Sequence, residues 1–451
     1  MAHSLPRRSF LTALAAPLAA HPLSAALAQP QPQAAASATA RIGPPSAGSL
    51  DAFIPRLERA LHENVNPFWF PRSLDREQGG YMINHDPAGL PNGRSSKMIV
   101  TQARMVWYFS RMVRAGMTKP ATRAQFAEAA EHGFQFLRAK MWDAAHGGYF
   151  WEVNRDGSPR NNQKHLYGQS FALYALSEMA VALNHQAARD AAIELFELLE
   201  RRAHDATHGG YIEDFEADWT ETPASQPTPM GPARQKLMNT HLHLMEAFTS
   251  FYRATTLPRA RERLLELITV ESNTVLRKDL AACADKYTRD WRRLAEGDYA
   301  RVSYGHDIEN VWLLMDACRA AGISDSPLHD LYRVNWAYCL EYGWDAATGA
   351  FCDSGLPRQP ADRRQKVWWV QAEALVSALK MYRLTGEPVY RAVFERTWNF
   401  TESQLIDWKH GEWHAEITAQ GQPRGDKAHI WKAGYHNGRA LVECLLDLRS
   451  A

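Results

Sequence analysis

The sequence has no excess of one charge, since its 51 Lys and Arg residues face 50 Asp and Glu residues over 451 positions. No long run of one sign interrupts this balance. Proteins that bind nucleic acid or acidic membranes normally carry a basic patch or stripe. The composition gives no sign of such a surface and favours a small neutral partner.

Cysteine is scarce, and no two cysteines form a C-x-x-C pair. Their odd number prevents a complete intramolecular disulfide framework, so structural thiols are expected. A glycine-rich dinucleotide fingerprint after a strand-like segment is also missing, which disfavours hydride chemistry. The five cysteines are Cys283, Cys318, Cys339, Cys352 and Cys444.

Long apolar runs are missing too, even near the N-terminus. The Leu- and Ala-rich stretch there is interrupted by Pro17 and Pro22 and falls far short of the ~20 residues of a membrane span. It follows Arg7 and Arg8 and ends at a small-residue site closed by Ala28. We therefore expect a twin-arginine-type signal, cleaved after Ala28, and a periplasmic or secreted protein with no membrane anchor.

Three segments follow from this interpretation. Residues 1–28 are the expected signal peptide. Residues 29–48, rich in Pro, Ala, Gln and Ser, are expected to form a flexible linker. Residues 49–451 are expected to form a single catalytic domain.

Alternating, strand-like patterns are almost absent after Leu50, and helical patterns separated by short Gly-bearing breaks dominate. Among these breaks, one turn recurs. An Asp is followed four residues later by Gly, then by a small or acidic residue and an aromatic. The copies begin at Asp75, Asp143, Asp205, Asp345 and Asp407.

Neighbouring copies of this turn lie 68, 62 and 62 residues apart, and a gap of 140 residues leaves room for one unit without the motif. Six units of two helices each result. Since each hairpin can bury its apolar face only against its neighbours, we expect a closed all-α (α/α)6 barrel with short β-hairpin turns, rather than an open solenoid. A ligand would bind in its central cavity.

Several polar residues at predicted helix starts could carry chemistry. His306 and Glu309 are three residues apart and share a helix face, although a polar first turn is the simpler explanation. His241 and His243 face different sides of a helix, so they are not joint metal ligands. We take His243, which shares a face with Asn239, as the inward one.

Other candidates lie near both ends of the domain. Arg104, inside an apolar segment, needs an anionic or carbonyl partner. Trp369 and Glu373, one helical turn apart, could form an aromatic platform beside a hydroxyl-binding carboxylate. Trp431 could stack on a sugar ring next to His436. Taken singly, each could equally be structural.

Together, these segments resemble the N-acylglucosamine 2-epimerase superfamily, and most closely its cellobiose 2-epimerase group. The resemblance extends from about residue 50 to the end. The matching segments are Gln102-Ala103-Arg104, Asn239 to His243, Ser303 to Glu309, Trp368-Trp369 with Glu373, and Trp431 with His436. The resemblance implies a catalytic set of Arg104, His243, His306, Glu309 and His436, and a sugar-binding set of Asn239, Trp369, Glu373 and Trp431.

The expected reaction is inversion of C2 of an aldose, of the mannose or glucose type or at the reducing end of a β-1,4 disaccharide. In this hypothesis Arg104 stabilises the enolate oxygen, and His306 and His436 exchange protons on opposite faces. Glu309 orients His306, and His243 assists ring opening. No metal, nucleotide or redox cofactor is required.

Three alternatives stay open from the sequence. A single base that shuttles the proton from C2 to C1 would make the protein an aldose–ketose isomerase. A glycoside hydrolase would need two inward carboxylates about 5 to 10 Å apart, for which Glu309 and Glu373 are the candidates. A non-catalytic sugar-binding protein would bind without turnover.

Overall fold

The computed structural model describes residues 42–450. The predicted export signal and the first part of the predicted linker lie outside these residues. In the rest of that linker, Ile42 is buried, and the backbone N–H of Ser46 donates to Glu395 at 2.6 Å. This end of the predicted linker therefore contacts the barrel through Ile42 and Ser46.

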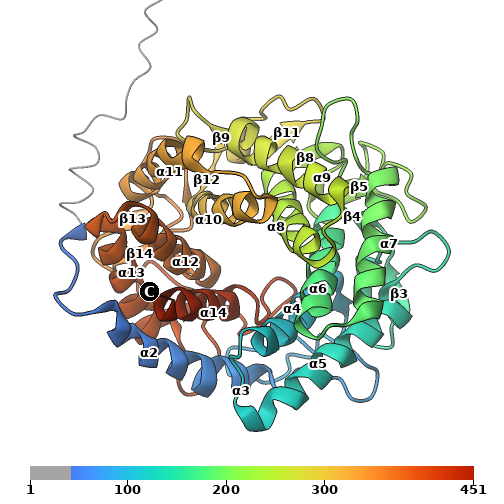
Figure 1. The fold of residues 1–451 in the computed structure, drawn as a ribbon, viewed down its shortest axis with the longest axis horizontal. Coiled ribbons are helices and arrows are strands. Elements are labelled where there is room, and N and C mark those ends of the chain that lie inside the picture. The colour runs from blue at the N-terminus through green and yellow to red at the C-terminus, as the bar shows by residue number, and fades with distance from the viewer. Residues whose placement is uncertain (1–41, 451) are drawn as a thin grey trace, which may run out of the picture.

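Helices form two concentric rings, as the sequence predicted for an (α/α)6 barrel (Figure 1). The inner ring consists of α4 (Ile99–Arg114), α6 (Leu166–Ala182), α8 (Met238–Thr255), α10 (Tyr304–Ala321), α12 (Trp368–Thr385) and α14 (His436–Arg449). The outer ring consists of α2 (Ile54–Arg59) with α3 (Asn66–Trp69), α5 (Arg123–Phe136), α7 (Gln186–Arg202), α9 (Pro258–Thr269), α11 (His329–Tyr342) and α13 (Pro388–Phe400). Contacts of α14 with α12 and α4 close the inner ring.

The hydrophobic pattern explains which helix takes which ring. Inner helices touch neighbours on every side, and in α6 each residue from Leu166 to Ala180 is buried. Outer helices bury only one stripe, which in α9 includes Ala260, Leu264 and Leu267. None of the helices between residues 42 and 450 is long and apolar enough to span a membrane.

Short antiparallel strands connect neighbouring units at the end of the barrel where the inner helices begin. Most of the sheets pair a strand just before an inner helix with a strand after the next outer helix. The sheets are β1 (Lys97–Met98), β2 (Glu152–Val153) and β3 (Pro159–Asn161); β4 (Lys164–His165) and β5 (Asp214–Phe215); β6 (Pro227–Thr228) and β7 (Gly231–Pro232); β8 (Gln235–Leu237) and β11 (Lys286–Thr288); β9 (Leu276–Arg277) and β10 (Ala282–Cys283); β12 (Val302–Ser303) and β15 (Ser354–Gly355); β13 (Trp344–Asp345) and β14 (Ala350–Phe351); and β16 (Lys366–Val367), β17 (Glu416–Ile417) and β18 (Pro423–Arg424).

The recurring turn has the backbone that its glycines require. In the first copy, Gly79 and Gly80 have φ of 81° and 65°. A Cβ on Gly80 would lie 2.7 Å from the side-chain oxygen of Gln102. The aromatic that follows, Tyr81, is buried between the two rings and donates its hydroxyl to Ala129. The aromatic of the turn therefore belongs to the core between the rings.

Each of the five turns is held by a buried lysine that the sequence reading did not use. Four of these lysines stand two residues before an inner helix, so the ion pair fastens the turn to the start of that helix. The pairs, with their Nζ to Oδ2 distances, are Lys97–Asp75 (2.9 Å), Lys164–Asp143 (2.7 Å), Lys236–Asp205 (3.0 Å), Lys366–Asp345 (2.9 Å) and Lys427–Asp407 (2.6 Å). We call them the turn latches.

The 140-residue gap between turn copies does contain a sixth unit, built from α9 and α10. Its hairpin lacks the latch, and Cys283 stands where the other units have an aromatic. The carboxylate of Asp307 accepts the Cys283 N–H at 3.1 Å, as Gln102 accepts the Tyr81 N–H at 2.8 Å in the first unit. The prediction of six units is confirmed.

Candidate active site

A cavity of about 180 Å³ lies at the end of the barrel where the six inner helices begin. Every inner helix contributes a residue from its first two turns, so six helix N-termini, each the positive end of a helix dipole, surround one small space. Seven of the nine predicted site residues line it. The lining residues are Arg104, Tyr167, Asn239, His243, His306, Trp368, Trp369, Trp431 and His436.

Arg104 points into this cavity and has only neutral partners among the described residues. Its guanidinium donates to the Trp431 carbonyl at 2.8 Å and to the Tyr167 hydroxyl at 3.2 Å. It also lies over the rings of Phe171 and Tyr435, at 4.2 and 4.7 Å from their centroids. The expected carbonyl partner is present, and no carboxylate neutralises the charge, which is available to an oxyanion in the cavity.

The two histidines of α8 point to opposite sides, as predicted. His241 accepts the backbone N–H of Tyr211 at 3.0 Å, outside the cavity. His243 lines the cavity, and its Nδ1 lies 2.9 Å from Glu246. Burial lowers the pKa of His243. Burial alone would raise the pKa of Glu246, but the positive charge of Arg439 and the hydrogen bond from His243 outweigh it and lower this pKa to about 2.

His436 pairs with Glu373 in the same way, at 2.7 Å between Nδ1 and Oε1. Burial, together with the charges of Arg104 and Arg439, holds the pKa of His436 well below its usual range. Glu373 lies fully buried beneath the cavity and also accepts the indole N–H of Trp312 at 3.0 Å. Glu373 is not among the residues that line the cavity, so the structure shows it as a partner of His436, and its binding of sugar hydroxyls stays a prediction.

Glu309 also lies where the sequence reading did not place it. No hydrogen bond joins it to His306 among the described residues. Glu309 instead accepts from Arg439 at 2.5 Å, one turn deeper in the barrel. His306 stays at the cavity wall with its ring 4.7 Å from that of Trp369, and burial lowers its pKa to about 4. The expectation that Glu309 orients His306 is therefore replaced by two other pairs, His243 with Glu246 and His436 with Glu373.

Arg439 joins these pairs from below. Its guanidinium donates to Glu246, to Glu309 and, at 2.8 Å, to Glu373. Tyr435 adds a hydroxyl hydrogen bond of 2.6 Å to Glu246. The sequence analysis did not identify Arg439 or Glu246. The signal that could have found them is the three-residue spacing of His243 to Glu246 and of His436 to Arg439.

Three of these groups have a spacing that a metal ion could use. Ligand atoms of Glu309, Glu373 and His436 lie within 4.8 Å of one another. The guanidinium of Arg439, however, already donates to both carboxylates. A cation is thus built into this position, and a second one beside it would be repelled.

Aromatic rings supply the rest of the cavity wall. Trp369 lies between two histidines, with ring centroids 4.7 Å from His306 and 5.8 Å from His436. Trp431 adds a second indole from the loop before α14. Trp368, the residue before Trp369, lines the cavity as well. Apolar faces beside polar groups are the arrangement that a sugar ring requires.

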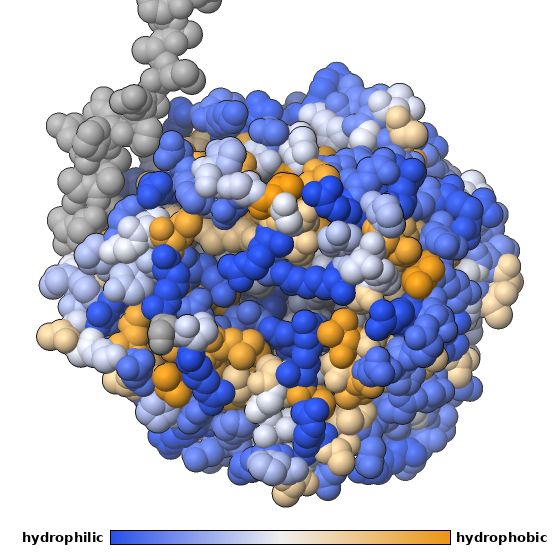
Figure 2. Space-filling model, in the orientation of Figure 1, coloured by the Kyte–Doolittle hydropathy of each residue, from blue (hydrophilic) through white to orange (hydrophobic). Residues whose placement is uncertain are grey.

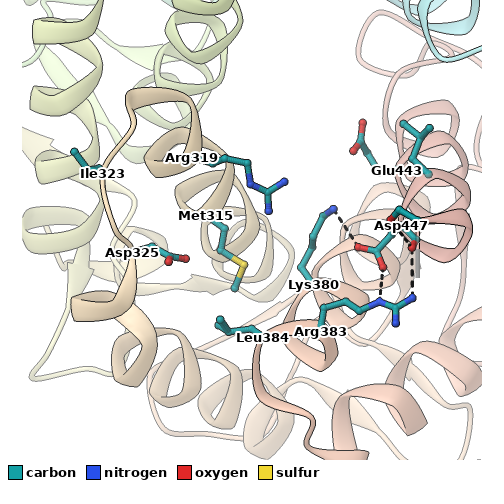
Figure 3. Close-up of a pocket in the computed structure, with 11 residues that line it drawn as sticks. Met315, Arg319, Ile323, Asp325, Lys380, Arg383, Leu384, Glu443 and Asp447 are labelled. Carbon is teal, nitrogen blue, oxygen red and sulfur yellow. Dashed lines mark hydrogen bonds and ion pairs between the residues drawn. The ribbon is translucent and has the colours of Figure 1, made fainter.

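A larger hollow lies elsewhere, at the end of the barrel where the inner helices finish. It measures about 820 Å³ and is bounded by the last turns of α10, α12 and α14. Lys380 and Arg383 donate to Asp447 there at 3.2 and 2.9 Å, while Arg319 reaches in from α10 (Figure 3). None of the predicted site residues lines it.

Comparisons with known proteins show which family this chain resembles. The family model of N-acylglucosamine 2-epimerase matches residues 79–440. A cellobiose 2-epimerase of Bacteroides fragilis is 30% identical over 398 residues, which cover 86% of this chain and 97% of that protein. A D-mannose isomerase of Marinomonas mediterranea is 25% identical over 407 residues, covering 86% and 95%. The solved structure of a cellobiose 2-epimerase from Bacillus thermoamylovorans B4167 superposes with a TM-score of 0.81 at 28% identity, covering 88% of this chain and all of that one.

Proposed function

This chain belongs to the N-acylglucosamine 2-epimerase family, as its motifs predicted, and from that premise we propose that it is a 2-epimerase of an aldose. The substrate is a sugar of the mannose or glucose type, or the reducing end of a β-1,4 disaccharide such as cellobiose. One observation carries the proposal. Two histidines, His306 and His436, line the same cavity as Arg104, which has no carboxylate partner among the described residues.

Arg104 provides the first requirement of the reaction. The hydrogen on C2 of an aldose becomes acidic only when the ring is open and the C1 carbonyl is polarised. A preorganised guanidinium at the carbonyl oxygen stabilises the negative charge that develops there, by roughly 3–4 kcal/mol for one such donor. The six helix N-termini around the cavity act in the same direction.

Inversion then needs two proton transfers on opposite faces of C2. One of His306 and His436 takes the C2 proton, and the electrons of the C–H bond form an enediolate whose charge rests on O1. The other histidine, which takes a proton from solvent once the enediolate has formed, delivers that proton to the opposite face of C2, and the C1 carbonyl forms again. The first histidine then releases its proton to solvent. His243, held by Glu246, assists ring opening by accepting the O1 proton. Each proton removed is returned, so no net proton is consumed.

The electrostatics of the free protein suit the first of these steps. Burial lowers the pKa of His306 to about 4 and holds that of His436 well below its usual range, so both are neutral at pH 7 and can accept a proton. The negative charge of the enediolate raises the proton affinity of a nearby imidazole. The proton donor therefore forms during the reaction.

The test is an NMR product screen in D2O with mannose, glucose and cellobiose. The proposal expects the 2-epimer with deuterium at C2, and loss of this product in His306→Ala and in His436→Ala. A ketose as the sole product would make the enzyme an aldose–ketose isomerase, the alternative that the mannose isomerase relative supports. Full activity in both variants would refute the assignment of the two histidines.

The same screen addresses the hydrolase alternative. Hydrolysis of cellobiose, abolished in Glu309→Ala, would support it. The geometry argues against hydrolysis, because neither Glu309 nor Glu373 lines the cavity and both accept hydrogen bonds from Arg439. Binding of a sugar without turnover in any arm would identify a sugar-binding protein.

We also propose that residues 1–28 export the folded protein by a twin-arginine route. The motif Arg7-Arg8-Ser9-Phe10-Leu11 supports this proposal. The double variant Arg7→Lys, Arg8→Lys should keep the full-length chain in the cytoplasmic fraction. Unchanged recovery of a shortened chain from the periplasm would refute the proposal.

A further inference from the structure

Both histidine–carboxylate pairs depend on the ionisation of a deeply buried glutamate. Glu246 is 4% exposed and Glu373 is fully buried. An ionised carboxylate accepts the Nδ1–H of its histidine, and this leaves Nε2 with a lone pair toward the cavity. A protonated carboxyl would instead donate to Nδ1 and move the imidazole hydrogen to Nε2. In that tautomer the histidine could not act as a base.

Burial alone would protonate such carboxylates, because it disfavours their charged form. Arg439 opposes this for two of them at once. It is 1% exposed, it donates to Glu246 and Glu373, and it lies over the rings of Trp312 and Tyr435 at 4.8 and 4.4 Å. These neighbours hold the guanidinium between the carboxylates.

The third carboxylate, Glu309, is the one whose protonation the surroundings favour most. Its Oε1 accepts from Arg439, whereas its Oε2 is buried and has no hydrogen-bond partner among residues 42–450. Burial, followed by repulsion from Glu373, raises the pKa of Glu309 well above its usual value. One guanidinium thus serves three carboxylates. Burial also raises the pKa of Glu373, and the charge and hydrogen bond of Arg439 act against that rise.

We propose that Arg439 is the positioning residue of the active site: it keeps Glu246 and Glu373 ionised and thereby fixes the base-competent tautomer of His243 and His436 together. It is not among the residues that line the active-site cavity. This inference rests on the proposed epimerase chemistry for its catalytic consequence, but the tautomers themselves can be observed without any reaction.

The structure also offers a way to test this role by chemical rescue. Arg439 and Glu246 form part of the wall of a second hollow, of about 210 Å³, on the side away from the active-site cavity. After truncation of Arg439, free guanidinium can enter from that side and bind between the carboxylates. Arg253, which lines the same hollow and donates to Asp316 at 2.8 Å, provides a matched control.

In the rescue experiment, kcat of Arg439→Ala is measured with the sugar that the wild-type protein epimerises. A loss of roughly 10³-fold is expected, the scale seen when the group that orients a catalytic histidine is removed. Guanidinium chloride, at concentrations well below those that unfold the protein, should restore part of it, and sodium or ammonium chloride should not. Arg253→Ala should lose no activity and should not respond. Loss without guanidinium rescue would overturn the proposal.

A second measurement does not depend on turnover. Imidazole ¹⁵N NMR should find the Nδ1–H tautomer for His243 and His436 in the wild-type protein, and a shift toward Nε2–H in Arg439→Ala and Arg439→Lys. Tyr435→Phe removes one hydrogen bond to Glu246, so it should change the tautomer of His243 and leave that of His436 unchanged. This variant provides the test if the arginine variants do not fold. Unchanged tautomers in a folded variant would overturn the proposal. A wild-type protein with no epimerase activity but with these tautomers would refute the proposed function alone.

Discussion

At the end of the barrel where the inner helices begin, the polar groups that face the cavity are left with incomplete partners, whereas at the other end most of them neutralise one another. Arg104, at the first end, donates only to neutral oxygens. At the second end, Arg253 donates to Asp316 at 2.7 Å and Arg383 to Asp447 at 2.9 Å. The last turns of the inner helices also attract these arginines through the negative end of the helix dipole.

This difference separates the site from the larger hollow. The hollow of about 820 Å³ at the second end is more than four times the volume of the active-site cavity of about 180 Å³. The face seen down the barrel axis is hollowed at its centre and surrounded largely by hydrophilic residues (Figure 2). A buried charge without a counter-charge is costly and is retained where a substrate completes it. Incomplete partners therefore identify the site better than volume does.

The largest effect should come from breaking a turn latch at the active-site end. Lys164 and Asp143 are buried, with side-chain exposures of 0% and 7%. Lys164→Met leaves the carboxylate without its closest cation, and about 3–5 kcal/mol of unfolding free energy should be lost. Denaturant unfolding measures this loss.

The control for that variant is Lys380→Met at the other end, whose side chain is 21% exposed in its pair with Asp447. A loss below about 1 kcal/mol is expected for it, because solvent screens the pair. Equal losses for the two lysines would contradict the distinction between the two ends.

Arg104→Met should change the free energy of unfolding less than the latch variant does. Its main effect should be on activity. Removal of one preorganised donor to an oxyanion lowers kcat by roughly 10²- to 10³-fold. The measurement is kcat and KM for the sugar identified in the product screen. Arg383→Met, which removes an arginine of the opposite end, should leave both constants unchanged. If the two variants lost similar activity, the unpaired guanidinium would not be the catalytic feature.

The pH dependence gives a third, milder test. Burial lowers the pKa of His306 to about 4, so the neutral imidazole that accepts a proton persists as the pH falls through the usual histidine range near 6.5. We expect kcat/KM to stay level from about pH 8 to about pH 6 and to fall only toward pH 4. Circular dichroism over the same range separates this fall from unfolding. An inflection near pH 6.5 would contradict the buried, neutral state of the base.

The ring could be predicted from the sequence because its repeating element is local. The turn needs an Asp that accepts N–H groups two and three residues later, and it needs a Gly with positive φ. Together these requirements fix the number of residues between the Asp and the Gly, so the turn can be recognised in the sequence. The latch lysines could not be recognised, since they follow the Asp by 20 to 31 residues and no local rule joins them. The unit without the motif was visible only as a gap.

The cavity wall could be predicted for the same reason, since its residues stand at helix starts. The partners beneath it could not. Residues three apart share a helix face, and on that ground we expected His306 to pair with Glu309. The hydrogen-bonded pair with this spacing is His243 and Glu246. Which neighbour a carboxylate meets depends on the element across the barrel. For Glu309 this is Arg439, 130 residues later in the chain.

The smallest effect is expected where the far end is altered alone. Arg253 and Asp316 form a two-point ion pair, but each side chain is 33% exposed. Arg253→Met, Asp316→Asn and the double variant define a cycle, in which the pair should contribute about 0–1 kcal/mol to the free energy of unfolding. Because these groups neutralise each other and face no reacting atom, kcat/KM should not change in any of the three variants. A coupling energy of this size together with a loss of turnover would mean that the far end takes part in the reaction, and the comparison between the two ends would fail at that point.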